Sequence, residues 1–163
     1  AKVAALQVRS PDRLAYVTQT TLSTDDTREV IHALKKRFKS IRGPDLSDIC
    51  YATQSRQDAV RLLAKEIDLL LVVGARNSSN SNRLREVGEQ NGLLSYLIED
   101  VGDLTPDWFS ETTRVGITAG TSAPEAMVER VLERLRGYGV SQVIEMDGKR
   151  EETRFRLPES LLS

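Results

Sequence analysis

The sequence predicts an α/β fold of three layers, α-β-α, built on a mostly parallel sheet. Two observations support this prediction. Apolar runs of strand length alternate with amphipathic segments of helical period, and short connections join them, a pattern typical of strand–helix–strand units. One run is also apolar at every position, as in a parallel strand that is buried on both faces.

The first third of the chain predicts one short strand and one helix. Residues 14–17 form an apolar run of strand length, and a loop rich in threonine and serine follows it. Ser23 or Thr24 can cap a helix with a regular apolar stripe. Basic residues suit the C-terminal end of this helix, and the Gly-Pro pair at residues 43–44 ends it.

The middle of the chain predicts a helix, a buried strand and a second helix. Residues 48–53 are expected to form a short extended segment or turn, in which Thr53, or Ser55 just after it, caps a helix. Residues 68–74 contain the continuously apolar strand. A polar loop follows this strand, and the next helix ends at the Asn-Gly pair of residues 91–92.

Two more strands are predicted after the Asn-Gly pair. They are expected at residues 93–98 and 114–118, where apolar residues cluster over strand length. The connection over residues 99–112 is polar, with one helical turn expected near residues 106–109.

The last predicted helix begins with a capping-box pattern. Ser122 and Glu125 have the required spacing, and the proline between them is tolerated in a first helical turn. Two glycines end this helix. A strand is expected at residues 142–145, and a weaker one at residues 153–157.

Composition excludes several classes of function. Lysine and arginine together number 23 against 24 acidic residues, so no basic excess exists to neutralise a nucleic acid. The longest apolar run is far too short to span a bilayer, and no signal peptide is predicted. The single cysteine excludes an intrachain disulfide, and with the single histidine it excludes a self-contained zinc site of four such ligands. We therefore predict a cytoplasmic protein without nucleic-acid or membrane partners.

Polar residues at the start of a helix suggest an anion site. Ser78, Ser79 and Asn80 follow the buried strand directly. Free backbone N–H groups and the helix dipole favour an anion there, and each side-chain hydrogen bond to a charged group adds about 1.5–3 kcal/mol. Helix capping alone explains one such residue but not three in a row. Both explanations stay open on the residues alone.

Three other residues have a structural and a functional explanation. The capping box already accounts for Ser122, and Thr20 lies in what could be an ordinary polar loop. Cys50 is either a small buried apolar residue or a thiolate at a helix start, where it could be one ligand of a shared metal site. His32 is expected on a helix surface.

Four segments together carry a family resemblance. They are YVTQTTLS at residues 16–23, DICYAT at 48–53, GARNSSNSNRL at 74–84 and GITAGTSAP at 116–124. In this order and spacing they resemble the 4-hydroxy-3-methylbut-2-enyl diphosphate reductase family, also called IspH or LytB. The resemblance covers about residues 10–160.

The resemblance implies an oxidoreductase of the non-mevalonate pathway of isoprenoid biosynthesis. Family members remove the hydroxyl of an allylic diphosphate with two electrons and protons, and form isopentenyl and dimethylallyl diphosphate. The family fold has three related α/β domains around an iron–sulfur cluster, 4Fe–4S in the active form. A ferredoxin or a flavodoxin is the implied electron donor.

The resemblance also implies roles for particular residues. Cys50 matches a cysteine that holds the cluster, and Thr53 lies beside it in the same motif. Thr20 matches the threonine near the substrate hydroxyl, so it is the implied catalytic residue. Four residues match those that hold the diphosphate: Ser78, Ser79, Asn80 and Ser122.

The sequence departs from the family because it lacks the first half. That half would bring two more cluster cysteines, the substrate-binding histidines and a glutamate of the proton relay. The chain is thus expected to contain a remnant of the second domain (residues 1–45), most of the third (46–136) and a C-terminal tail (137–163). Alone it is expected to form no stable cluster and to be inactive.

Two alternatives remain. The chain could be a stand-alone α/β module that binds a phosphorylated small molecule without redox chemistry. It could also be an inert fragment prone to misfolding, since an incomplete domain at residues 1–45 would expose apolar surface.

Overall fold

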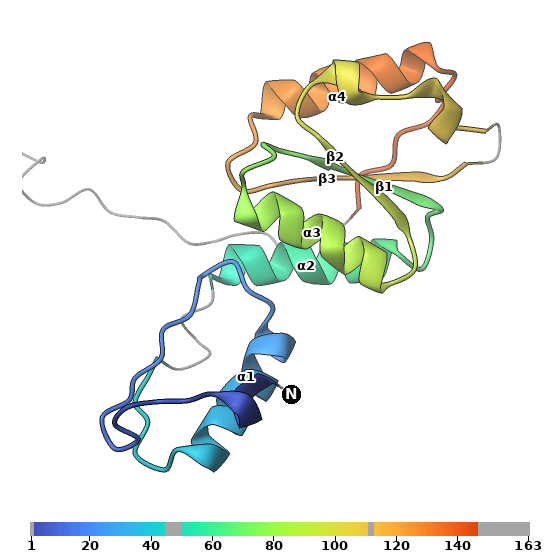
Figure 1. Ribbon diagram of the computed structural model, residues 1–163. Coiled ribbons are helices and arrows are strands. Elements are labelled where there is room, and N and C mark those ends of the chain that lie inside the picture. The colour runs from blue at the N-terminus through green and yellow to red at the C-terminus, as the bar shows by residue number, and fades with distance from the viewer. Residues whose placement is uncertain (1, 45–49, 111–112, 147–163) are drawn as a thin grey trace, which may run out of the picture.

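The computed structural model describes residues 2–44, 50–110 and 113–146 (Figure 1). Within these residues three parallel strands form one sheet: β1 (Leu69–Val73), β2 (Leu94–Ile98) and β3 (Val115–Ala119). The order is β2-β1-β3, so β1 lies in the centre. All five of its residues are buried, which confirms the predicted strand with two covered faces.

Helices cover both faces of this sheet. Helix α4 (Glu125–Gly137) lies on one face, and α2 (Tyr51–Leu63) and α3 (Ser79–Gln90) lie on the other (Figure 1). Alternate residues of β1 supply the two cores. On the α4 side the buried residues include Leu69, Leu71, Val73, Val131 and Leu135. On the α2 and α3 side they include Val60, Leu70, Val72, Leu84 and Val87. The three-layer prediction is confirmed.

The connection between β2 and β3 contains two short 3-10 helices. The second, η4 (Pro106–Trp108), is the helical turn expected near residues 106–109, whereas the first, η3 (Val101–Asp103), was not expected. The rings of Tyr96 and Trp108 stack with centroids 3.8 Å apart, which attaches this connection to the edge strand β2.

The N-terminal part contains a 3-10 helix, η1 (Lys2–Ala5), and helix α1 (Thr24–Arg37). Ser23 caps α1, because its Oγ accepts a hydrogen bond from the N–H of Asp26 at 3.4 Å. His32 is exposed on α1, as expected. Figure 1 shows this part beyond α2, away from the sheet.

The predicted strand at residues 14–17 is wrong. The described residues form only an isolated parallel bridge there, between Ala15 and Arg42. A strand needs neighbours on which to pair, and Val17 is 90% exposed. The strand expected at residues 142–145 is also wrong, since Val143 and Ile144 are exposed and irregular. Residues 153–157 lie outside the described residues.

Two predicted helix caps are also wrong. Helix α2 begins at Tyr51 with Cys50 as its N-cap, so Thr53 is buried in the first turn and cannot cap it. The capping box in α4 does not form, because Pro124 is the N-cap and Ser122 lies two residues before it. In both cases the helix begins at a residue other than the hydroxyl residue that suggested a cap. This leaves the hydroxyl of Ser122 outside the helix.

Candidate functional site

The loops after β1 and β3 leave the sheet side by side. These strands are neighbours, with Val73 paired to Ala119 at their carboxyl ends. The N–H of Gly120 donates to the carbonyl of Val73 at 2.9 Å. A Cβ at either Gly74 or Gly120 would collide with the side chain of Ser81. The two glycines therefore let the first turn of α3 approach both loops closely.

Ser78 caps α3. Its Oγ accepts hydrogen bonds from the N–H of Ser81 at 3.2 Å and from the Oγ of Ser81 at 3.0 Å. Capping thus explains one of the three polar residues at this helix start. Ser79, the first residue of the helix, is exposed.

Asn80 is not explained by capping. Its side chain is buried, with 3% of the residue exposed, and neither its oxygen nor its nitrogen has a hydrogen-bond partner among the described residues. Its Nδ2 lies 3.6 Å from the position that a Cβ at Gly120 would occupy, so it faces the loop after β3. An unsatisfied buried amide costs about 1–3 kcal/mol. Such a group at a helix N-terminus indicates a ligand that would satisfy it.

Ser122 lies in this same loop, in the turn closed by the N–H of Ala123 and the carbonyl of Gly120 at 3.0 Å. It is exposed and does not cap α4. The structure therefore brings the loop of Ser122 against the helix start that carries Asn80, as the predicted diphosphate site requires.

Thr20 and Cys50 also lie together. The N–H of Cys50 donates to the carbonyl of Thr20 at 3.2 Å. The Nε2 of the buried Gln57 donates to the carbonyl of Thr21 at 3.5 Å, which attaches the same segment to α2. Thr20 and Cys50 are both exposed.

A cavity of about 330 Å³ joins the Thr20 segment to the start of α3. Its lining includes Ser79 and the two neighbours of Thr20 in the sequence, so the two segments border one space, although Thr20 itself is not part of the lining. The complete lining is Gln19, Thr21, Leu22, Asn77, Ser79, Asn82, Arg83 and Glu86.

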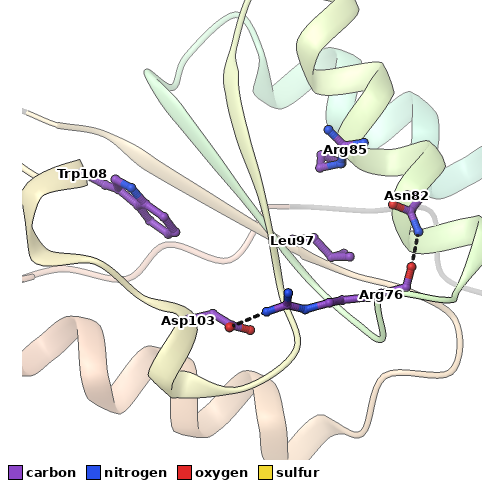
Figure 2. Close-up of a pocket in the computed structure, with 6 residues that line it drawn as sticks. All are labelled: Arg76, Asn82, Arg85, Leu97, Asp103 and Trp108. Carbon is purple, nitrogen blue, oxygen red and sulfur yellow. Dashed lines mark hydrogen bonds and ion pairs between the residues drawn. The ribbon is translucent and has the colours of Figure 1, made fainter.

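A second cavity, of about 420 Å³, lies beside β2 and contains none of the predicted site residues. Figure 2 shows Arg76 pointing toward Asp103 in this cavity, and the Nη2–Oδ1 distance is 2.8 Å. The Nδ2 of Asn82 donates to the carbonyl of Arg76 at 2.7 Å. Arg76 and Asn82 thus hold the loop that leads to Ser78. Sequence reasoning missed both residues, although Asn82 belongs to the polar run that drew attention to the loop.

Asp103 is held in its charged form. The N–H groups of Glu99 and Asp100 donate to its Oδ2 at 2.9 and 3.1 Å. These two backbone hydrogen bonds, that of Asp100 above all, lower the pKa of Asp103, and the guanidinium of Arg76 lowers it further. The pKa of Asp68 is also lowered, mainly by a hydrogen bond from the N–H of Arg114. The loop before α3 is therefore anchored to an ionised carboxylate.

The described residues do not form a complete metal site. Cys50 is the only cysteine of the sequence, and it lies at the N-terminus of α2, where a thiolate is favoured. In residues 2–44, 50–110 and 113–146 no three histidine, cysteine or acidic side chains come together as ligands.

The sequence profile described as "LytB protein" matches residues 1–136, most of the chain. The chain belongs to the LytB family. Curated relatives named 4-hydroxy-3-methylbut-2-enyl diphosphate reductase support this assignment. The relative from Acinetobacter baumannii is 53% identical over 161 residues, and that from Ectopseudomonas mendocina is 56% identical over 161 residues. Each alignment covers 99% of this chain and 51% of the relative, so the chain spans about half the length of these LytB proteins.

Solved structures agree with this assignment. The E-1-hydroxy-2-methyl-but-2-enyl-4-diphosphate reductase of Plasmodium falciparum is 30% identical and superimposes with a TM-score of 0.81, over 98% of this chain and 51% of that one. A structure titled (E)-4-hydroxy-3-methyl-but-2-enyl diphosphate reductase, the terminal enzyme of the non-mevalonate pathway, is 34% identical with a TM-score of 0.53, over 76% and 43%. The LytB resemblance and the α/β fold are confirmed. Within the described part of the chain, no helix has the length and apolar character needed to cross a bilayer.

Proposed function

We propose that this chain supplies the diphosphate-binding part of a 4-hydroxy-3-methylbut-2-enyl diphosphate reductase. The observation that carries the proposal is the buried, unpartnered amide of Asn80 at the start of α3, beside Gly120. The names of the relatives support the choice of substrate.

The proposed site binds the diphosphate through neutral donors. Backbone N–H groups in the first turn of α3, the hydroxyls of Ser79 and Ser122 and the Nδ2 of Asn80 donate to diphosphate oxygens, while the dipole of α3 favours their negative charge. Ser78 caps the helix and presents its hydroxyl at the same edge. Binding would satisfy the amide that folding leaves without a partner.

The proposed reaction is a two-electron reduction. The C–O bond to the hydroxyl breaks, a C–H bond forms, and two electrons and two protons are consumed, with water and isopentenyl or dimethylallyl diphosphate as products. The proposed electron donor is a ferredoxin or a flavodoxin, and the proposed compartment is the cytoplasm. In this proposal Thr20 donates a hydrogen bond to the substrate hydroxyl.

An iron–sulfur cluster, proposed as 4Fe–4S, would supply the single-electron transfers when bound. Cys50 would be one of its thiolate ligands and Thr53 would lie close to it, because both begin α2. The other ligands would come from residues beyond this chain, in the half of the relatives that it does not span. The domain division at residues 45–46 and 136–137 remains part of this proposal.

Calorimetric titration of the chain with inorganic diphosphate tests the proposed site. Asn80→Ala should weaken binding by about 10–150-fold, which is the loss of affinity expected when one hydrogen bond to a charged group is removed. Asn91→Ala is the matched control, because Asn91 lies at the other end of α3, where its side-chain Nδ2 donates to the carbonyl of Val87. No binding by the unchanged chain, or a change below threefold for Asn80→Ala, would contradict the proposal.

A non-redox module that binds a phosphorylated small molecule is the second candidate. It is favoured by the fact that the anion-binding residues all lie within the described α/β unit. In a module of this kind Cys50 has no role, so cluster formation with the other half of a relative distinguishes the two functions.

A further inference from the structure

Arg83 makes an unusual connection between α3 and α1. Its Nη2 contacts the carboxylate of Asp26 in the first turn of α1, and its Nη1 contacts Glu86 of its own helix at 3.0 Å. The side chain of Arg83 is only 15% exposed. The guanidinium is thus largely shielded from solvent, whereas the carboxylates of Asp26 and Glu86 are 64% and 45% exposed, so water and salt reach the ion pairs from the carboxylate side.

Asp26 is directly connected to the Thr20 segment. Its N–H donates to Ser23, the cap of α1, and Thr20, Thr21 and Leu22 immediately precede that cap. An ion pair that fixes the position of Asp26 therefore also restrains the Thr20 segment. Arg83 lies about one helical turn beyond Asn80 on α3, so the ion pair fixes the Thr20 segment relative to the start of that helix.

The other described tethers of this segment lead to α2. Asp25 contacts Arg61 of α2 at 3.7 Å, and Gln57 of α2 donates to the carbonyl of Thr21. Among the described residues, Asp26 and Arg83 form the ion pair between α1 and α3. Arg83 also lines the 330 Å³ cavity between the Thr20 segment and Ser79.

We propose that Arg83 is a positioning residue that sets the distance from the diphosphate site to Thr20. It would thereby select ligands that carry a hydroxyl at a fixed distance from their diphosphate. Arginine suits this position because its planar fork contacts two carboxylates at once, those of Asp26 and Glu86. The inference rests on the proposed function and adds the source of its selectivity.

The test compares two diphosphates in calorimetric titrations of the chain: 4-hydroxy-3-methylbut-2-enyl diphosphate and isopentenyl diphosphate, which lacks the hydroxyl. Asp26→Asn and Arg83→Ala should each leave the affinity for isopentenyl diphosphate within twofold. Both variants should weaken the hydroxylated ligand by about threefold to tenfold, as expected for one misplaced neutral hydrogen bond. The ratio of the two affinities is the readout, because a purely structural defect would weaken both ligands equally.

Two controls make the test specific. Arg85→Ala removes an arginine that pairs with Glu89 of the same helix, and it should leave the ratio unchanged. The charge exchange of Asp26→Arg with Arg83→Asp should restore the ratio at least in part. Asp26 is 64% exposed, so Asp26→Asn keeps the test decisive if Arg83→Ala fails to fold.

The outcomes separate the two proposals. If the unchanged chain binds neither diphosphate, the proposed function is wrong. If it binds both and the ratio is unchanged in Asp26→Asn and Arg83→Ala, the positioning role is wrong while the diphosphate site stands.

Discussion

The backbone of Cys50 donates a hydrogen bond of 3.2 Å to the carbonyl of Thr20, thirty positions earlier in the chain. This bond joins the start of α2 to the segment before α1. It places the one thiol of the sequence next to the threonine that the resemblance assigns to the substrate hydroxyl. The two residues with implied roles at the reacting end of the substrate are therefore neighbours, although distant in sequence.

Removing the buried amide of Asn80 should weaken ligand binding without lowering the stability of the fold. Because folding leaves the side chain of Asn80 unsatisfied, Asn80→Ala should leave the free energy of unfolding unchanged or raise it by up to about 1 kcal/mol. Urea unfolding of the unliganded chain measures this. A loss above about 1 kcal/mol would show that Asn80 has a structural role.

The serines at the site should divide into one that stabilises the fold and two that bind the ligand. Ser78→Ala removes the cap of α3 and should cost about 1 kcal/mol of unfolding free energy. Ser79→Ala and Ser122→Ala remove exposed hydroxyls that cap no helix, so they should weaken diphosphate binding with little change in stability. Thermal unfolding and calorimetry on the same samples compare the two effects. Equal affinities for unchanged and variant chains would exclude these serines from the site.

The close approach of α3 should depend on glycine. Gly120→Ala should lower the free energy of unfolding by about 1–3 kcal/mol, because its Cβ would collide with the buried Ser81. Gly137→Ala is the matched control: it ends α4 with open space around it, so a small gain in helix stability is expected. Equal effects of the two substitutions would show that α3 can shift away from the loops.

Acid should weaken the anchor of the loop before α3. The pKa of Asp103 is lower in the folded chain than its ordinary value of 3.8, so its contribution to stability is complete above that value. The contribution is lost as the pH falls below 3.8 through the folded pKa. Asp103→Asn should therefore make the free energy of unfolding less dependent on pH below about 4. An identical slope in both proteins would contradict an ionised anchor.

Cys50 should be needed for a cluster but not for the diphosphate. The chain co-expressed without oxygen with the N-terminal half of the Acinetobacter baumannii relative should give a coloured complex with the visible absorption of an iron–sulfur cluster. Cys50→Ser should abolish the colour and leave diphosphate affinity within twofold. An equally coloured Cys50→Ser complex would remove Cys50 from the ligands.

Local patterns predicted the sheet and its helices well. The apolar run of β1 and the periodic stripes of α1, α3 and α4 need only neighbouring residues to be recognised. Strands 14–17 and 142–145 were wrong because a strand depends on distant partners, and those apolar residues have no sheet beside them in the described structure.

The candidate residues of the site stand out in the sequence, but their contacts do not. Polar residues after β1 and β3 were recognised because ligands bind at the carboxyl ends of parallel strands. The unsatisfied amide of Asn80 depends on what surrounds it in space, and the contact of Asp26 with Arg83 joins positions 57 residues apart. No local pattern contains either fact.

The stacking of Trp108 on Tyr96 gives the chain a built-in optical probe. Trp108 is the only tryptophan of the sequence, so its fluorescence comes from one known place. It borders the cavity of Arg76 and Asp103, which anchor the loop leading to α3 (Figure 2). A ligand that tightens this loop should alter the emission of Trp108, and binding can then be followed in real time without any attached dye.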